Sequence, residues 1–234
     1  SAYPRITVNP QTNSEYCLQN GKPFTMHGTT FFVTDAYRGC YLHFNAARCG
    51  EELAAIARDG FNILRTGNWR ENLAFYGPDG ECSEKAMRAL EIFFMLAAEN
   101  NLTVQFVLGS FMFNNWDRTK DPLHNPEIRQ KVMRVMRTFC TRFADFPNVM
   151  MDIINEPSYS FRGGWTLGRP SLDEYEKKHW IEWLREKYRG DLSALHDAWR
   201  CTGVQVPSFE EAPLPEDSAF DRFIARTEKD IRYA

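Results

Sequence analysis

Four short apolar runs alternate with helical segments along the chain, and this alternation constrains the fold more than any other feature of the sequence. The apolar runs lie at residues 24–32, 61–65, 102–108 and 149–154. The helical segments between them lie at residues 51–59, 83–100 and 126–143. Apolar runs of this length, and the run at residues 149–154 in particular, are typical of strands buried on both faces in a parallel sheet. Strands that alternate with helices predict right-handed βαβ units and hence an α/β fold.

Two α/β architectures fit this alternation, a closed (β/α)8 barrel and an open doubly wound sheet. The loops after the strands are long and rich in Trp, Phe and Asn, whereas the turns after the helices are short. A barrel carries its functional residues in the loops after its strands, so this asymmetry favours the barrel. An open sheet usually has a glycine-rich phosphate loop after its first strand, and the segment His27-Gly28-Thr29-Thr30 lacks that pattern. We therefore predict a (β/α)8, or TIM, barrel.

The chain accounts for about half of such a barrel. Its 234 residues contain four βα units of a fold that needs eight. We expect a β flap at residues 1–23, with a tight turn at Asn20-Gly21, and the N-terminal half of the barrel at residues 24–234. After Pro157 the sequence predicts further helices rather than strands. These helices are expected at residues 172–188, 191–199 and 217–234.

Composition and charge argue against several classes of function. The formal net charge is −3 and 25% of the residues are charged, which gives no electrostatic footprint for nucleic acid. No apolar stretch approaches the roughly 20 residues that a membrane helix needs. Six cysteines are scattered without a Cys-x-x-Cys pair, which argues against a zinc site. We expect no metal site and no cofactor. Their spacing leaves disulfides open, but we expect Cys140 to pack in the core from the apolar face of its helix.

A pair of polar residues follows the fourth apolar run, where the sequence reads Asn155-Glu156-Pro157. Pro157 cannot donate to a sheet ladder and favours an extended backbone at Glu156, so the strand is expected to stop there. This leaves an amide and a carboxylate at the C-terminal end of a buried strand, where a barrel carries its catalytic residues. The alternative is that both are ordinary polar residues of a loop. The second apolar run ends in Arg65, which adds a cation at the same edge.

With four strands placed, the chain resembles the N-terminal half of a clan A glycoside hydrolase. The similarity is to the family 5 cellulases and mannanases and to the family 42 β-galactosidases, and it covers nearly the whole chain. The stretches that carry it are Gly21–Phe24 leading to Gly28–Phe32, Gly60–Arg65 and Asp152–Pro157. The segment from Trp183–Tyr188 to Leu195–Trp199 is similar to a helical insert that follows the fourth strand in such enzymes.

The resemblance implies a retaining enzyme that cleaves β-linked glycosides or polysaccharides by double displacement without a cofactor. Glu156 would be the general acid/base, which protonates the leaving oxygen and then deprotonates water. Asn155 would hydrogen-bond the sugar 2-hydroxyl, and Arg65 would hold the nucleophile ionised and oriented. A structural ion pair is the alternative role for Arg65. Many relatives carry a histidine near the end of the third strand, but residues 108–111 contain none, which leaves the substrate subfamily open.

Aromatic residues in the loops after the strands are candidate sugar-binding residues, because aromatic faces stack on sugar rings. These candidates are Trp69, Phe111, Trp116, Tyr159 and Trp165. Packing within the loops is the alternative role for these side chains. His27 either lines the floor of the substrate pocket or is a satisfied core histidine.

A retaining enzyme also needs a second carboxylate about 5 Å from the first. No carboxylate after Glu156 ends an apolar strand, so we expect the nucleophile to lie outside this chain and the isolated chain to be inactive. The partner would be the missing C-terminal half of the barrel, from the same gene or a second chain, or another copy of this chain. Two alternatives stand beside this: a non-catalytic carbohydrate-binding half-barrel or pseudoenzyme, and a purely structural half. Action on polysaccharide would favour a secreted or periplasmic protein.

Overall fold

The computed structural model of this chain describes residues 3, 5–8, 17–31, 44–67, 75–108, 120, 124–153, 173–200 and 203–213. The chain divides into two compact units. The first unit comprises Ser1–Asn115 and Lys131–Asn155, and the second comprises Trp116–Gln130 and Glu156–Ala234.

The first unit is built on a four-stranded parallel sheet with the strand order β4-β5-β6-β7. The strands are β4 (Gly28–Thr30), β5 (Ile63–Gly67), β6 (Thr103–Val107) and β7 (Val149–Asp152). The helices that alternate with them are α1 (Ala46–Arg58), α3 (Glu84–Glu99) and α4 (Pro126–Arg142). Of α4, the part from Lys131 onward belongs to this unit. Neighbouring strands are parallel and follow the order of the sequence, which confirms the predicted βα alternation and the α/β class.

Capping side chains set the starts of the three helices. Ser83, the first residue of the helical segment expected at residues 83–100, is the N-cap of α3, and its hydroxyl accepts a backbone N–H of the first turn. The side-chain oxygen of Asn125 does the same at the start of α4. Helix α1 begins at Ala46 rather than at Glu51, because the side chain of Asn45 is its N-cap.

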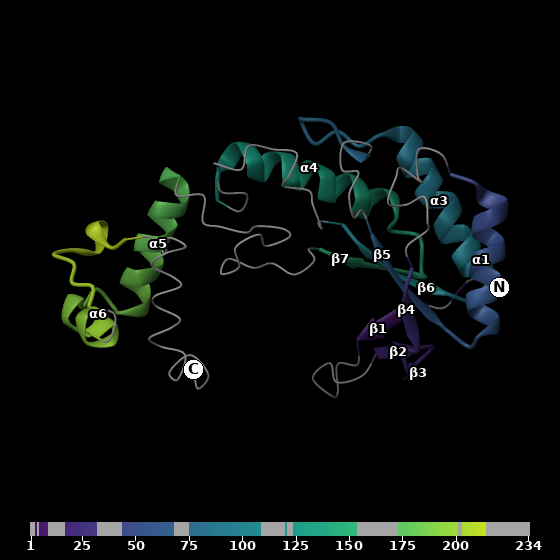
Figure 1. Cartoon of the computed structure of the whole chain (residues 1–234), viewed down its shortest axis with the longest axis horizontal. Coiled ribbons are helices and arrows are strands. Elements are labelled where there is room, and N and C mark those ends of the chain that lie inside the picture. Colours follow the sequence, from purple (N-terminus) through teal and green to yellow (C-terminus); the bar gives the residue numbers. More distant parts are fainter. Residues whose placement is uncertain are drawn as a thin grey trace. The chain divides into compact units, whose positions relative to one another are not determined.

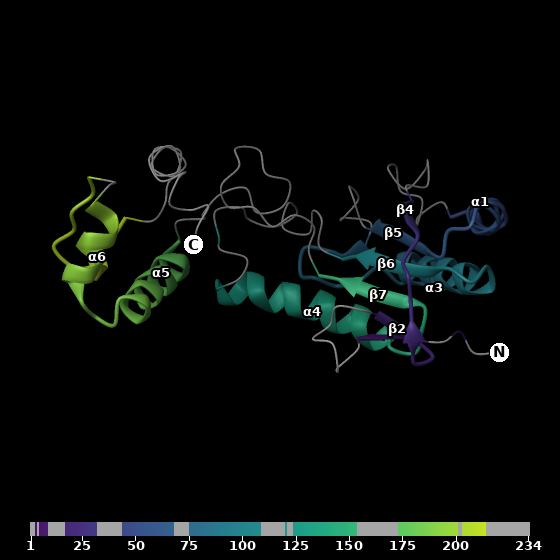
Figure 2. The same cartoon turned by 90° about the horizontal axis from the view of Figure 1, so that it is seen from below.

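Helices α1, α3 and α4 lie along one face of the parallel sheet (Figure 1, Figure 2). The β6 residues that face them, Val104 and Phe106, are fully buried. Phe94 of α3 lies 5.7 Å from Phe106 and 5.0 Å from Phe143 between ring centroids. These rings fill the layer between the sheet and the helices, and each removes a large apolar area from water.

The opposite face of the sheet carries the alternate residues of each strand, because successive side chains of a strand point to opposite faces. On β5 and β6 the central residues, Arg65 and Gln105, are half-buried between buried neighbours. All four residues of β7 are half-buried. The expectation that the run at residues 149–154 is buried on both faces is therefore wrong, because the described helices cover one face of the sheet.

The N-terminal segment contains an antiparallel sheet, in the region where the flap was expected. Its strands are β1 (Ile6–Val8), β2 (Cys17–Gln19) and β3 (Lys22–Pro23). Asn20 and Gly21 join β2 to β3 with φ angles of 53° and 72°, the tight turn that the sequence predicts. The Tyr3 hydroxyl lies 2.7 Å from the Thr103 hydroxyl at the start of β6, so the N-terminal segment contacts the parallel sheet.

Arg142 at the end of α4 joins that helix to α3. Its Nη1 and Nη2 donate to the two carboxylate oxygens of Glu84 at 2.6 and 3.0 Å, and its Nε donates to Glu91 at 2.8 Å. The hydrogen bonds from Arg142, with another from Arg88, lower the pKa of the Glu84 carboxyl to about 2.

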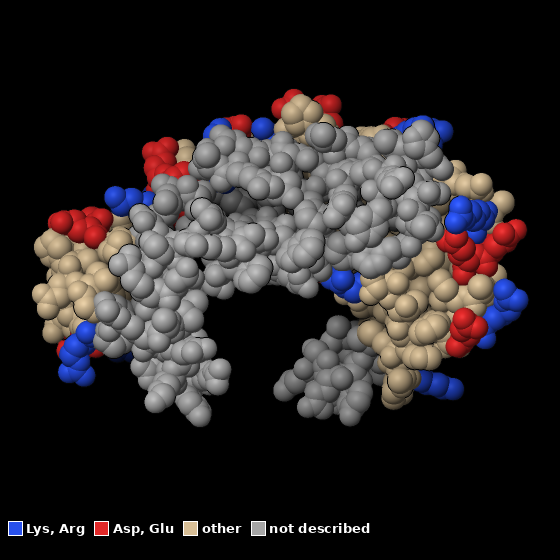
Figure 3. All heavy atoms as spheres, viewed as in Figure 1, with Lys and Arg blue, Asp and Glu red and all other residues tan. Residues whose placement is uncertain are grey.

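On the face drawn in Figure 3, acidic and basic side chains lie beside one another over the described surface.

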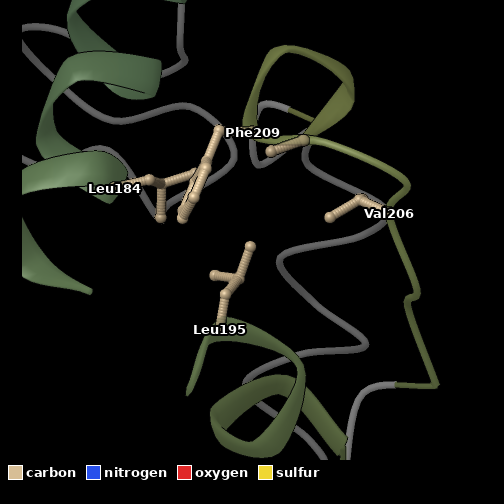
Figure 4. Packing of buried hydrophobic residues seen from close by; sticks show 5 residues of the cluster. Leu184, Leu195, Val206 and Phe209 are labelled. Atoms are coloured by element: carbon tan, nitrogen blue, oxygen red, sulfur yellow. The ribbon is translucent and has the colours of Figure 1, made fainter. Parts of the chain in front are cut away.

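The second unit has a small apolar core of its own. It contains α5 (Glu174–Lys187), α6 (Leu192–Trp199) and the 3-10 turn η4 (Phe209–Glu211). The buried side chains that point toward one another in this core (Figure 4) are Leu184, Leu195, Val206 and Phe209. Asp173 and Asp191 cap the two helices, which lie where the sequence predicts them. The helix predicted at residues 217–234 falls outside the described residues.

Cys140 is exposed, so the prediction that it packs in the core is wrong. The buried stripe of α4 follows Ile128, Val132, Val135 and Phe139. Cys140 comes directly after Phe139, and it therefore lies about 100° further round the helix, outside the stripe.

Gly67 at the end of β5 offers a test of how closely β5 and β6 approach. A Cβ atom at this position would lie 2.6 Å from the Val107 carbonyl oxygen, which is backbone and cannot rotate away. We expect Gly67→Ala to destabilise the protein by about 1–3 kcal/mol, the usual cost of overpacking. Urea unfolding measures this loss. Gly77→Ala is the matched control, because a Cβ there meets nothing within 4 Å. Equal midpoints for the two variants would contradict the close approach.

The Arg142–Glu84 pair predicts how stability depends on pH. Because the folded pKa of Glu84 is about 2 and its ordinary value is 4.5, the pair stabilises the fold above pH 4.5. That stability is lost as the pH falls from 4.5 towards 2. We expect Arg142→Gln to flatten this part of the stability profile, measured by urea unfolding at a series of pH values. Arg134→Gln is the control, since the ion pair that Arg134 makes among the described residues is a long one, 3.8 Å from Glu81. A profile for Arg142→Gln as steep as the wild type would show that the pair is energetically silent.

Candidate functional site

Polar side chains from three adjacent strands meet on the sheet face opposite the helices. They are Arg65 of β5, Gln105 of β6 and Asp152 of β7, and we call them the inner-face cluster. The Gln105 amide donates to Oδ2 of Asp152 at 3.1 Å, and Nη2 of Arg65 lies 3.5 Å from the same oxygen. One carboxylate oxygen therefore links all three strands.

The parallel register sets the shape of this cluster. Arg65 pairs with Gln105 across the sheet, whereas Asp152 pairs with Val107, nearer the carboxyl edge. Because β6 separates β5 from β7, Arg65 spans roughly 10 Å between strand axes to reach Asp152. Only a long side chain reaches that far. The guanidinium is thus drawn toward the edge at which β7 leads into Asn155.

The Arg65–Asp152 pair contributes more to the position of the Arg65 guanidinium than to the stability of the fold. The two side chains are 33% and 23% exposed, so water screens their attraction. Pairs of this kind are worth about 0–1 kcal/mol. A guanidinium has five N–H donors in a fixed fork, a geometry that suits carboxylates. The cluster can therefore hold the positively charged guanidinium of Arg65 in a defined place near the carboxyl edge of the sheet.

Arg65 is the one predicted catalytic residue within the described part of the chain. It lies in the middle of β5 rather than at its end, since Thr66 and Gly67 continue the strand. Apart from His27, the other predicted site residues fall outside the described residues. These are Asn155, Glu156, Trp69, Phe111, Trp116, Tyr159 and Trp165.

His27 lies at the amino-terminal edge of the sheet, directly before β4, and its side chain is exposed. Its backbone N–H donates to Asn62 Oδ1 at 2.8 Å, and its Nδ1 lies 3.1 Å from the Gly60 carbonyl oxygen. Its ring stacks on Phe61 with 4.7 Å between centroids. These contacts hold the turn that leads from α1 into β5. Strand β4 is shorter than the strand predicted at residues 24–32. His27 is therefore not a core histidine, since its side chain is exposed, but its contacts are with this turn.

Sequence reasoning missed Gln105 and Asp152. Gln105 is the polar residue in the middle of the third apolar run, and Asp152 interrupts the fourth. A polar residue at the centre of a buried strand needs a partner, which is the signal that marks both positions. The partners themselves lie 47 residues apart in the sequence, so the pairing had no local signature.

Among the described residues, no group of three or more His, Cys, Asp or Glu side chains is placed to hold a metal ion. No helix in the described part of the chain is long and apolar enough to cross a membrane. The described thiols of Cys49, Cys82 and Cys140 are free. Burial raises the pKa of Cys49 to about 12 and that of Cys82 to about 11, so both are protonated and unreactive at neutral pH.

Comparison with known proteins relates this fold to carbohydrate-active enzymes. No protein-family model and no curated protein matches the sequence. Among solved structures, an exo-beta-1,4-mannosidase from Opitutaceae bacterium strain TAV5 aligns over 83% of this chain and 33% of its own, with 17% identity and a TM-score of 0.56. The beta-1,4-D-mannanase from Cryptopygus antarcticus aligns over 97% of this chain and 68% of its own, with 14% identity and a TM-score of 0.52. The beta-mannanase from the blue mussel Mytilus edulis aligns over 68% and 48%, with 15% identity and a TM-score of 0.51.

These similarities establish the fold class. Identities this low show the fold alone, and the chain spans about a third of the mannosidase and less than half of the mussel enzyme. The chain therefore has a glycoside-hydrolase-like α/β fold that corresponds to part of a (β/α)8 barrel, as the sequence predicts. Its structural neighbours include enzymes named as a β-1,4-mannosidase and as β-mannanases.

The placement of His27 predicts that it affects stability and not sugar binding. Replacing it with Ala removes the ring stack and the contact with the Gly60 carbonyl, so we expect a loss of about 0.5–1.5 kcal/mol in urea unfolding. Affinity for β-linked oligosaccharides, measured by calorimetric titration of the same sample, is expected to stay unchanged. A tenfold loss of oligosaccharide affinity with unchanged stability would show that His27 lines the substrate pocket.

Proposed function

We propose that this chain supplies the acid/base half of the active site of a retaining glycoside hydrolase that acts on β-linked oligo- or polysaccharides. The observation that carries the proposal is the inner-face cluster, in which Asp152 draws Arg65 toward the carboxyl edge of the sheet. The chain reaches Asn155-Glu156 within four residues of that edge. The glycoside-hydrolase-like fold gives the arrangement its chemical context.

Strand periodicity supports the assignment of Glu156. In an extended chain, residues separated by four positions lie on the same face. Glu156 follows Asp152 by four, so an extended continuation of β7 would direct its carboxyl to the face of Arg65. The carboxyl edge of parallel strands is where barrel enzymes hold their catalytic groups.

The proposed reaction proceeds by double displacement. Glu156 donates its proton to the glycosidic oxygen as the bond to the anomeric carbon breaks, while a second carboxylate forms a covalent bond to that carbon. Glu156, now ionised, then removes a proton from water, whose oxygen displaces the second carboxylate. Asn155 binds the 2-hydroxyl of the sugar. Arg65 keeps the second carboxylate ionised and oriented by charge-assisted hydrogen bonds.

The second carboxylate is proposed to come from the remaining part of the barrel, supplied by the same gene, a second chain or another copy of this chain. The sugar would be held by stacking on aromatic side chains of the loops that follow the strands. Those proposed for this role are Trp69, Phe111, Trp116, Tyr159 and Trp165. The structurally similar enzymes include a β-1,4-mannosidase and two β-mannanases, so β-1,4-linked mannosides are the first substrates to test.

A non-catalytic carbohydrate-binding protein is the second candidate. The observation that favours it is that Arg65 has a carboxylate partner, Asp152, within this chain. The arginine therefore does not need a nucleophilic carboxylate to balance its charge. In that case the same aromatic loops bind sugar without turnover.

Replacing Glu156 with Gln in the full-length protein tests the acid/base role. We expect hydrolysis of β-mannosides with poor leaving groups to fall by about 10²–10⁴-fold, the usual contribution of acid–base catalysis. Aryl β-mannosides with strongly acidic leaving groups should lose much less in the bond-breaking step, because they leave without protonation. Steady-state and burst kinetics measure both.

Glu99→Gln is the matched control, because Glu99 is an exposed carboxylate at the end of α3. Equal losses for good and poor leaving groups would remove Glu156 from the acid role. Sugar binding by a wild-type protein that hydrolyses none of the substrates would support the second candidate.

A further inference from the structure

We propose that Asp152 is the positioning residue for Arg65, and that Gln105 in turn fixes Asp152. The proposal rests on the function proposed above. In that function Arg65 orients the second carboxylate, so the position of its guanidinium matters. It assigns a role to two residues that take no part in bond breaking.

A single oxygen atom organises the cluster. Oδ2 of Asp152 accepts the Gln105 amide at 3.1 Å and lies 3.5 Å from Nη2 of Arg65. The first distance is that of a full hydrogen bond, and the second is that of an ion pair at longer range. Gln105 therefore fixes the carboxylate, and the carboxylate attracts the guanidinium.

The register explains why this attraction has a direction. The backbone of Arg65 is level with its cross-strand neighbour Gln105. Asp152 lies level with Val107, two residues further along β6 toward the carboxyl edge. The ion pair therefore extends the arginine side chain along the sheet, toward the end from which Asn155 and Glu156 follow.

Charge, rather than size, is the property that this role requires. Asn at position 152 would keep the volume and one acceptor oxygen, but it would lose the negative charge that attracts Arg65. Glu at the same position would keep the charge and move it by one methylene. If Asp152 served only to fill space, Asn at this position would be tolerated better than Glu. If its carboxylate positions Arg65, Glu would be tolerated better than Asn.

The direct test is the mobility of the Arg65 guanidinium in the whole protein. Arginine side-chain ¹⁵N NMR resolves the two Nη groups when rotation about the Nε–Cζ bond is slow, and Arg65→Lys identifies the Arg65 signals by deleting them. We expect slowed rotation in the wild type and in Asp152→Glu, and averaged signals in Asp152→Asn. The matched control is Asp145→Asn, because Asp145 is an exposed carboxylate in the turn before β7. Arg65 signals that are the same in Asp152→Asn and in the wild type would overturn the proposal.

The functional readout separates positioning from a general structural role. We expect Asp152→Asn to lower kcat for β-mannosides by about ten- to a hundredfold with little change in KM, because a displaced Arg65 misplaces the second carboxylate. Asp152→Glu should recover part of the loss, and thermal unfolding should change little in either variant. An active wild type whose kcat is unaffected by Asp152→Asn would reject the proposal.

The two proposals fail in different ways. If the wild type hydrolyses no glycoside while Asp152→Asn still releases the Arg65 signals, the catalytic function is wrong and the positioning of Arg65 stands. If hydrolysis depends on Glu156 while the Arg65 signals are insensitive to Asp152, the function stands and the positioning role is wrong.

Discussion

The packing of aromatic rings between the parallel sheet and its helices is the interaction on which the described fold depends. Phe94, Phe106 and Phe143 meet where α3, β6 and α4 converge, and all three are buried. Because strand side chains alternate between faces, fixing Phe106 against the helices also directs Gln105 to the other face. The apolar layer thus decides which residues can form a polar cluster.

That polar cluster contributes little to the free energy of unfolding, but it has a defined geometry. The Arg65–Asp152 pair is partly exposed, and its attraction is correspondingly weak. Its geometry follows from the strand register, which places Asp152 nearer the carboxyl edge than Arg65. Stability and position therefore have different sources in this sheet: buried rings supply the first, and an ion pair across three strands supplies the second.

Local signals made most of the elements predictable. Ser83, Asn125 and Asp191 mark helix starts because their side chains accept orphan N–H groups of the first turn. The errors have equally physical causes. Cys140 is one residue away from the buried stripe of α4, and a shift of one residue along a helix is enough to move a side chain from the core to the solvent. The start of α1 was missed because Asn45 caps the helix, which begins at Ala46, five residues before the expected start at Glu51.

The sequence by itself determined the alternation of strands and helices, and hence a parallel α/β sheet, because periodicity and capping act over a few residues. It also singled out Arg65 as a functional candidate. Only the tertiary structure decided that Arg65 meets Asp152 and Gln105, and that His27 lies at the opposite edge of the sheet. Such pairings depend on the register between strands that are distant in the chain, and no local pattern records that register.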